Sequence, residues 1–472
     1  MNRFVVLLLL LSTIIYGQAL EIGIFPDSIL AEMPASAAGI NVNYLMDGGR
    51  TSLARISLSE TLKDMGVRYL RYPGGEKSDL YMFCPPPYDH SEPTVTRTVG
   101  LDQYPGMFNP DGTLVYDPLD FDEFMELCRE VEAEPIIVVA ADRYMLPIGN
   151  GERPASRDRL IEHAAAWVRY ANIERGYGIK YWMVGNETWN DNNPGSTAHI
   201  YARDVRDFSV AMKAVDPSIL IIANGEKEEY FGTIITEAGD CIDRLCVSNY
   251  GCYDFISGYA SYETSDKCLI YPAMTAINAL NRFATSIQRE RLRMIVAEYG
   301  TIDWFGNWDG VNDMGHAIAT FDMTGQLFNQ PQIEFSCFWN TRWIENIDAA
   351  MPHDHDALAP DGTLYPTGMA LKMFNMYRLP KVVACTSASA VKSFATVDKE
   401  KNIGTLLTLN KGQVDVDIIL TVAGGKPRLY RHYEYYGTSP NDMKPCWGDV
   451  DLSENSKVCL RPYSINVITF AY

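Results

Sequence analysis

Short apolar runs alternate with amphipathic segments between about residues 38 and 345. Segments such as Leu119–Val131, Arg157–Glu174 and Ala198–Val215 repeat apolar residues every three or four positions, the spacing of one helix face. Strands alternating with helices indicate a parallel sheet, and eight repeats predict a (β/α)8 TIM barrel over residues 38–380. The eight apolar runs are Ala38–Tyr44, Val67–Tyr72, Glu134–Ala140, Tyr181–Val184, Ile219–Ala223, Arg244–Ser248, Met294–Ala297 and Ile333–Trp339.

The pattern changes at about Lys381 to alternating apolar and polar positions separated by Gly and Pro. This predicts an accessory C-terminal β-sandwich over residues 381–472. An early strand, Glu21–Phe25, lies within residues 20–37 and is expected to join that sheet. The other expected strands are Val382–Thr386, Lys392–Thr396, Ile403–Leu409, Val414–Ile419 and Ser464–Tyr472.

Residues 1–19 have the pattern of a signal peptide. Asn2 and Arg3 precede the apolar run Phe4–Tyr16, and small residues follow in Gly17–Ala19. We therefore expect a secreted or periplasmic protein. No later stretch approaches the length of a membrane-spanning helix, so no membrane is expected as a partner of the mature form.

Charge and cysteine content narrow the functional classes. The formal net charge of -20 is spread along the chain and argues against nucleic acid as a partner. Among ten cysteines, the pairs Cys252 with Cys268 and Cys446 with Cys459 flank loops and are candidates for disulfides. No spacing is typical of zinc, and the run His353–Asp356 favours a solvated or substrate-contacting loop over an ion site. No metal or cofactor is predicted.

Two glutamates follow apolar strands in similar contexts. Glu187 ends the fourth barrel strand and Glu298 ends the seventh. Catalytic groups of a barrel lie at the C-terminal ends of its strands, and retaining glycosidases need two facing carboxyl groups. Either glutamate alone could be an ordinary strand-terminal charge, whereas the matched pair favours catalysis by Glu187 and Glu298.

Three motifs carry a resemblance to a known group of enzymes. Val184-Gly185-Asn186-Glu187 and Val296-Ala297-Glu298-Tyr299-Gly300 resemble the acid/base and nucleophile motifs of clan A glycoside hydrolases. Leu70-Arg71-Tyr72-Pro73-Gly74-Gly75 resembles the family 51 α-L-arabinofuranosidases and the related families 39 and 79. The resemblance implies a retaining mechanism in which Glu187 is the acid/base and Glu298 the nucleophile.

The same resemblance implies substrate-binding roles for further residues. Asn186 is expected to bind a sugar hydroxyl, and Arg71 and Tyr250 to hold the nucleophile, with Asn249 and Glu76 beside them. The alternatives are an ion pair at the barrel mouth for Arg71 and a packed core aromatic for Tyr250.

Five tryptophans follow the fourth, seventh and eighth strands, where a barrel keeps its binding loops. Sugars stack on such rings through their apolar faces. Core packing and sugar contact are equally compatible with any single one of them. The candidates are Trp189, Trp304, Trp308, Trp339 and Trp343.

The sequence therefore predicts a secreted, metal-independent, retaining glycoside hydrolase that cleaves a plant or algal polysaccharide or its oligosaccharides. Glu76 stands where family 51 has Asn, and Asn43-Tyr44 where it has Glu-His. These differences keep open whether the enzyme is an α-L-arabinofuranosidase or acts on another glycan, such as a galactan or a xylan. A non-catalytic carbohydrate-binding protein on a degenerate barrel is the alternative from another class.

Overall fold

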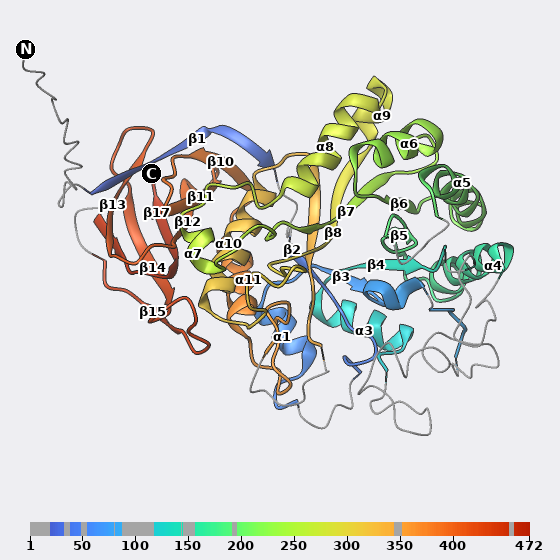
Figure 1. Cartoon of the computed structure of the whole chain (residues 1–472), viewed down its shortest axis with the longest axis horizontal. Coiled ribbons are helices and arrows are strands. Elements are labelled where there is room, and N and C mark those ends of the chain that lie inside the picture. Colours follow the sequence, from blue (N-terminus) through green and yellow to red (C-terminus); the bar gives the residue numbers. More distant parts are fainter. Residues whose placement is uncertain are drawn as a thin grey trace, which may run out of the picture.

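Eight parallel strands close into a barrel in chain order in the computed structural model, which confirms the predicted fold class (Figure 1). Each strand coincides with one of the eight apolar runs. The strands are β2 Ala38–Asn41, β3 Tyr69–Tyr72, β4 Glu134–Val139, β5 Tyr181–Val184, β6 Leu220–Asn224, β7 Arg244–Tyr250, β8 Arg293–Gly300 and β9 Ile333–Phe338.

The structure describes residues 19–32, 38–48, 54–79, 81–86, 118–142, 144, 156–190, 196–343, 352–452 and 457–472. Residues 1–18 of the predicted signal peptide lie outside these ranges. Within these ranges, no helix has both the length and the apolar character needed to cross a bilayer.

Helices cover the outside of the barrel, and local sequence signals set their ends. α3 begins after Asp120, which forms a capping box with Glu123, and α5 begins after Thr197, whose hydroxyl accepts from the Ile200 N–H. The helices are α1 Leu58–Asp64, α3 Phe121–Val131, α4 Arg157–Val168 with its π-helical extension η3 Arg169–Glu174, α5 Ala198–Val215, α6 Glu228–Ala238, α7 Tyr259–Glu263, α8 Tyr271–Phe283, α9 Ser286–Arg291, α10 Met314–Phe328 and α11 Pro366–Tyr377; η1 Gly75–Asp79 is a 3₁₀ turn.

The C-terminal β-domain is a nine-stranded, mostly antiparallel sheet. The hydrogen bonding is continuous through all nine strands, and three of them, β14 to β16, have no counterpart among the expected strands. In order across the sheet they are β15 Cys446–Asp449, β14 Arg428–Tyr436, β17 Ser464–Ala471, β12 Ile403–Asn410, β11 Val391–Asp398, β10 Lys381–Cys385, β1 Leu20–Glu32, β13 Val416–Val422 and β16 Lys457–Leu460.

The N-terminal strand β1 is part of this C-terminal sheet. It pairs antiparallel with β10 and parallel with β13, and Ile22 and Ile24 are buried in the core of the β-domain. In Figure 1 the blue β1 accordingly lies beside orange and red strands.

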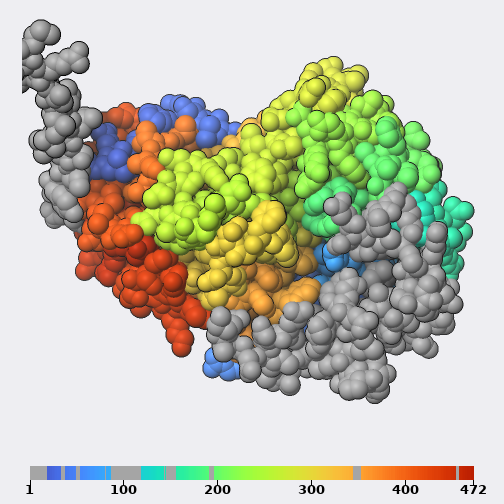
Figure 2. All heavy atoms as spheres, in the orientation of Figure 1, coloured from blue at the N-terminus to red at the C-terminus, as the bar shows by residue number. Residues whose placement is uncertain are grey.

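The barrel and the β-domain form two adjoining lobes (Figure 2). A Cβ on Gly325 of α10 would lie 2.3 Å from the ring of Phe394, so glycine lets β11 approach the helix closely. The buried Lys411 after β12 donates to the carbonyl of Tyr262, at 3.0 Å. The β-domain is therefore packed onto the barrel by both apolar and polar contacts.

The structure does not support the two expected disulfides. Cys252 is buried while Cys268 is exposed, and both carry free thiols. Cys446 of β15 and Cys459 of β16 also carry free thiols.

Candidate active site

A β-bulge places Glu298 inside the barrel. Along β8, Ile295 and Ala297 face the barrel interior, so strict alternation would turn the next residue outward. The register between β7 and β8 shifts at this point: Val247 pairs with Val296, but Ser248 pairs with Glu298. The extra residue re-aims the carboxyl group into the mouth of the barrel, a role that bulges often have beside active sites.

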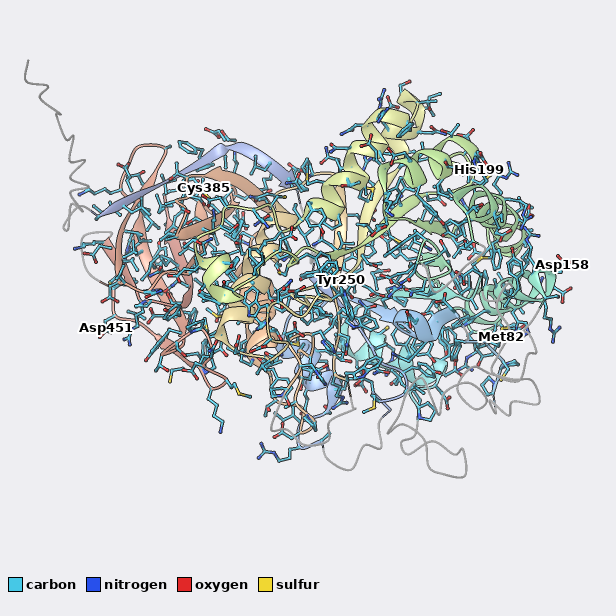
Figure 3. The ribbon with its side chains drawn as sticks, in the orientation of Figure 1. Met82, Asp158, His199, Tyr250, Cys385 and Asp451 are labelled. Atoms are coloured by element: carbon cyan, nitrogen blue, oxygen red, sulfur yellow. The ribbon has the colours of Figure 1, made fainter. Side chains whose placement is uncertain are left out.

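Two donors hold the Glu298 carboxyl group. Arg71 Nη1 donates to Oε1 at 2.8 Å, and the Tyr250 hydroxyl donates to Oε2 at 2.8 Å. All three side chains are buried. Burial and the charge of Glu298 raise the pKa of Tyr250 well above its usual value, so the hydroxyl stays protonated and remains a donor. The two donors fix the orientation of the Glu298 carboxyl group. Figure 3 labels Tyr250 near the middle of the molecule.

Arg71 connects four barrel strands. Besides Glu298 it donates to Asn41 Oδ1 at 2.7 Å and to Asn186 Oδ1 at 2.6 Å. Asn41 pairs with Arg71 in the β2–β3 register and donates to the carbonyl of Ala297 at 2.9 Å. Because guanidinium only donates, the oxygen of Asn186 must face Arg71, and its amide nitrogen is directed elsewhere.

The Pro-Gly-Gly run after β3 has a steric cause. Gly74 has φ +105°, and a Cβ there would lie 2.2 Å from the carbonyl oxygen of Val42. Gly75 has φ +57°, and a Cβ there would lie 2.2 Å from the ring of Trp339. Only glycine lets this turn pass so close to β2 and to the tryptophan after β9.

Glu187 occupies a different environment from Glu298. It follows β5, has φ +42° and is partly exposed. Burial of the carboxyl, with the charge of Glu298, raises its pKa to about 8; hydrogen bonds from Ser248 and Asn190 oppose the shift, and the charge of Glu76 adds to it. The carboxyl is thus protonated at neutral pH and accessible. A left-handed backbone on a non-glycine residue is uncommon and tends to occur at functional sites.

A buried lysine lies within electrostatic reach of Glu298. Lys77 in η1 has its Nζ 4.0 Å from the ring centroid of Trp343 and 5.5 Å from that of Trp339. Burial lowers the pKa of Lys77 to about 7, although the charges of Glu298 and Glu76 raise it. Trp339 and Trp343 lie beside Lys77, and both are partly exposed. Trp189, two residues after Glu187, is also partly exposed.

The structure does not bring Asn249 or Trp308 into this group. Asn249 is fully buried and faces outward from β7, where its amide donates to the carbonyl of Leu269 at 3.1 Å and accepts from the N–H of Ala273 at 3.3 Å. The alternation along β7 turns Tyr250 inward and Asn249 outward. Trp308 is only 6% exposed and packs beside His316 and Tyr262. The expectation that these two contact substrate is corrected.

The run His353–Asp356 makes contacts within the protein. The His355 ring pairs with Asp354 at 3.0 Å, and Asp354 also faces His316 at 3.8 Å. Among the residues described by the structure, no group of three His, Cys, Asp or Glu side chains could hold a metal ion.

Sequence reasoning missed Asn41, Lys77 and Asp79, which lie next to the expected residues. Asp79 Oδ1 accepts from the backbone N–H of Asn186 at 3.0 Å and so fixes the acid loop. A polar Asn41 inside an apolar strand was a usable signal, because a buried amide requires a partner. The other two follow the Pro-Gly-Gly turn and had no such signal.

Comparison with known proteins agrees with the motifs. The family model "Alpha-L-arabinofuranosidase 1 domain" matches residues 61–267. A probable α-L-arabinofuranosidase C of Aspergillus niger is 27% identical over 190 residues, which cover 36% of this chain and 32% of the relative. The match thus spans about a third of that relative's length.

Solved structures extend the likeness to the whole fold. The α-L-arabinofuranosidase of Thermotoga maritima, solved as an arabinose complex, has a TM-score of 0.73 at 17% identity and covers 96% of this chain and 100% of its own. The GH51 α-L-arabinofuranosidase of Thermotoga petrophila has a TM-score of 0.71 at 17% identity, with 95% and 99% covered. The predicted resemblance is confirmed: the chain is similar to the clan A, family 51 enzymes, in sequence over the first part of the barrel and in fold throughout.

Proposed function

We propose that this protein is a retaining glycoside hydrolase that acts on an arabinose-containing polysaccharide or oligosaccharide. The supporting observation is the contrast between two strand-end carboxyl groups. Glu298 accepts hydrogen bonds from Arg71 and Tyr250, whereas Glu187 is accessible and has its pKa raised to about 8. A nucleophile and an acid need such contrasting environments at one pH.

The reaction we propose is a double displacement. A Glu298 oxygen attacks the anomeric carbon while the bond to the glycosidic oxygen breaks, and that oxygen takes the proton of Glu187. Water then attacks the anomeric carbon, gives a proton to Glu187 and releases Glu298. The side-chain oxygen of Asn186 accepts a hydrogen bond from Arg71, which leaves the amide nitrogen to donate to a sugar hydroxyl.

The comparisons with arabinofuranosidases support an arabinose-containing substrate. Asn43 and Tyr44, however, stand where family 51 has a Glu-His pair. Asn43 donates to the carbonyl of Arg342 at 3.3 Å, and the ring of Tyr44 packs edge-on to Tyr72 and Tyr81. These contacts are within the protein, so the sugar is recognised by a different set of groups, with Glu76 among the candidates.

The test begins with the wild-type protein on 4-nitrophenyl α-L-arabinofuranoside, arabinan and arabinoxylan, with galactan and xylan as alternatives. Glu298→Gln should lose activity by several orders of magnitude. Glu187→Gln should be rescued by azide on the activated aryl substrate, because azide needs no general base. Glu434→Gln is the matched control, since Glu434 is a buried carboxyl paired with Arg461 at 2.9 Å in the β-domain.

Proton NMR of the first product distinguishes the mechanisms. The first product of a retaining enzyme has the same anomeric configuration as the substrate. A first product of the opposite configuration would refute the role given to Glu298. Binding of arabinan without any turnover would instead favour a carbohydrate-binding protein.

We also propose that the chain is exported, on the basis of the charged and apolar pattern of residues 1–19. Expression of the full chain with its natural start should yield an extracytoplasmic product that begins near Leu20. A product that keeps Met1 and stays in the cytoplasm would contradict export.

A further inference from the structure

Exposed aromatic side chains project from the loop that follows β8, and the partly exposed Tyr253 lies in the loop after β7. Trp304 is 61% exposed and Phe305 is 74% exposed, although most large apolar side chains of the barrel are buried. In Figure 2 these loops form adjoining yellow-green and yellow surfaces. Two neighbouring exposed rings at the mouth of a barrel are a typical surface for stacking sugars.

The β8 loop is held in a fixed shape by one side chain. Asp303 Oδ1 accepts from the N–H of Phe305 at 2.9 Å, and Oδ2 accepts from the N–H groups of Asn307 at 2.8 Å and Trp308 at 3.1 Å. Gly306 has φ +70°, which completes the turn. The rings are thus displayed on a preorganised loop, which reduces the entropy lost on binding.

The buried Trp308 fixes the other end of this loop in the protein core. Its ring lies 4.5 Å from that of His316 and 6.0 Å from that of Phe255, and its side chain is buried. One end of the aromatic loop is therefore fixed in the core, while Trp304 and Phe305 face solvent. This division explains why the three aromatic residues of one loop have such different exposure.

The exposed rings continue from the catalytic group. The ring of Trp304 lies 5.6 Å from that of Tyr250, the donor to Glu298, and the ring of Phe305 lies 5.1 Å from that of Tyr253. The exposed rings therefore lead outward to solvent from Tyr250, which donates to Glu298.

We propose that Tyr253, Trp304 and Phe305 form an aromatic platform that binds sugar units of an oligomeric or polymeric glycan next to the unit that is cleaved off. The inference rests on the proposed hydrolase function and adds a substrate preference: the enzyme favours substrates with sugar units beyond the cleaved bond over glycosides with a single-ring leaving group.

The test compares kcat/KM on an α-1,5-linked arabinopentaose with kcat/KM on 4-nitrophenyl α-L-arabinofuranoside. Phe305→Ala and Trp304→Ala should lower the ratio of the two values by about tenfold each, because a sugar loses its apolar contact. Tyr430→Ala removes an exposed ring from the β-domain, 52% exposed, and should leave the ratio unchanged. Thermal unfolding of each variant checks that the fold is kept.

Equal losses on both substrates, or an unchanged ratio in both platform variants, would overturn the platform. Those results leave the hydrolase proposal standing, since wild-type activity on either substrate supports it independently. If the wild-type protein cleaves neither these substrates nor arabinan and arabinoxylan, the proposed function fails instead, and the preference inferred for it fails with it.

Discussion

The hydrogen bond from Tyr250 to Glu298 provides a sharp test of the site. Tyr250→Phe removes one hydroxyl, 2.8 Å from Oε2, and keeps the ring that packs against Trp304. Hydrogen bonds to charged groups contribute about 1.5–3 kcal/mol. If the Tyr250 hydroxyl keeps this bond while Glu298 attacks the substrate, its removal lowers kcat/KM by about 10- to 150-fold. Steady-state hydrolysis of the aryl arabinofuranoside measures it.

Tyr262→Phe is the matched control for this experiment. Tyr262 is buried, and its hydroxyl donates to the carboxyl of Asp322 at 3.0 Å, away from the site. Both variants lose a buried tyrosine–carboxylate hydrogen bond, so both should lower the thermal unfolding temperature, but only Tyr250→Phe should lower kcat/KM strongly. Unchanged kcat/KM in Tyr250→Phe, or an equal loss in Tyr262→Phe, would refute the assignment of Tyr250 to the nucleophile.

Three further predictions follow from charges described above. Because the pKa of Glu187 is raised to about 8, kcat/KM should fall as pH rises through about 8. A value of kcat/KM that stays unchanged up to about pH 9.5 would contradict the acid role. Arg71→Met leaves the Glu298 charge buried without its partner, so denaturant titration should show a loss of about 3–5 kcal/mol in unfolding free energy; unchanged stability would contradict the pairing. Burial lowers the pKa of His316, but Asp313 and other acidic neighbours outweigh it, so the folded-state pKa is raised. The protonated ring therefore stabilises the fold fully below about pH 6.5, and this stabilisation is lost as pH rises through the folded-state pKa. The unfolding temperature of His316→Gln should lack that part of the pH dependence, and identical pH curves for variant and wild type would refute the pairing.

The sequence was sufficient to predict the barrel because each strand is an apolar run that the helices and the barrel interior bury on both sides. It was less informative where packing decides. Nothing in the residues around Glu298 predicts the bulge that turns its side chain inward, although its place at a strand end and the family motif both pointed to this residue. Asn249 shows the opposite case, since simple alternation from Tyr250 already places it on the outer face.

The predictions for Trp308 and for the cysteine pairs were wrong for a different reason. Trp304 and Trp308 are four positions apart in one loop, yet Trp304 is exposed and Trp308 is buried, because the backbone is folded around Asp303 and Trp308 packs on His316. Cys446 and Cys459 are near in sequence but belong to two strands, β15 and β16, whose places in the sheet no local pattern specifies.

The placement of β1 also affects how the protein is made. Glu21 accepts a hydrogen bond from the Thr421 hydroxyl, 400 residues later in the chain. At synthesis rates of about 5–20 residues per second, the ribosome needs about 20 to 80 seconds to deliver that partner. During this interval Ile22 and Ile24 lack the sheet that buries them. The N-terminal strand therefore needs protection from aggregation until translation is almost finished, and a chain that ends before β10 would leave β1 without either of its partner strands.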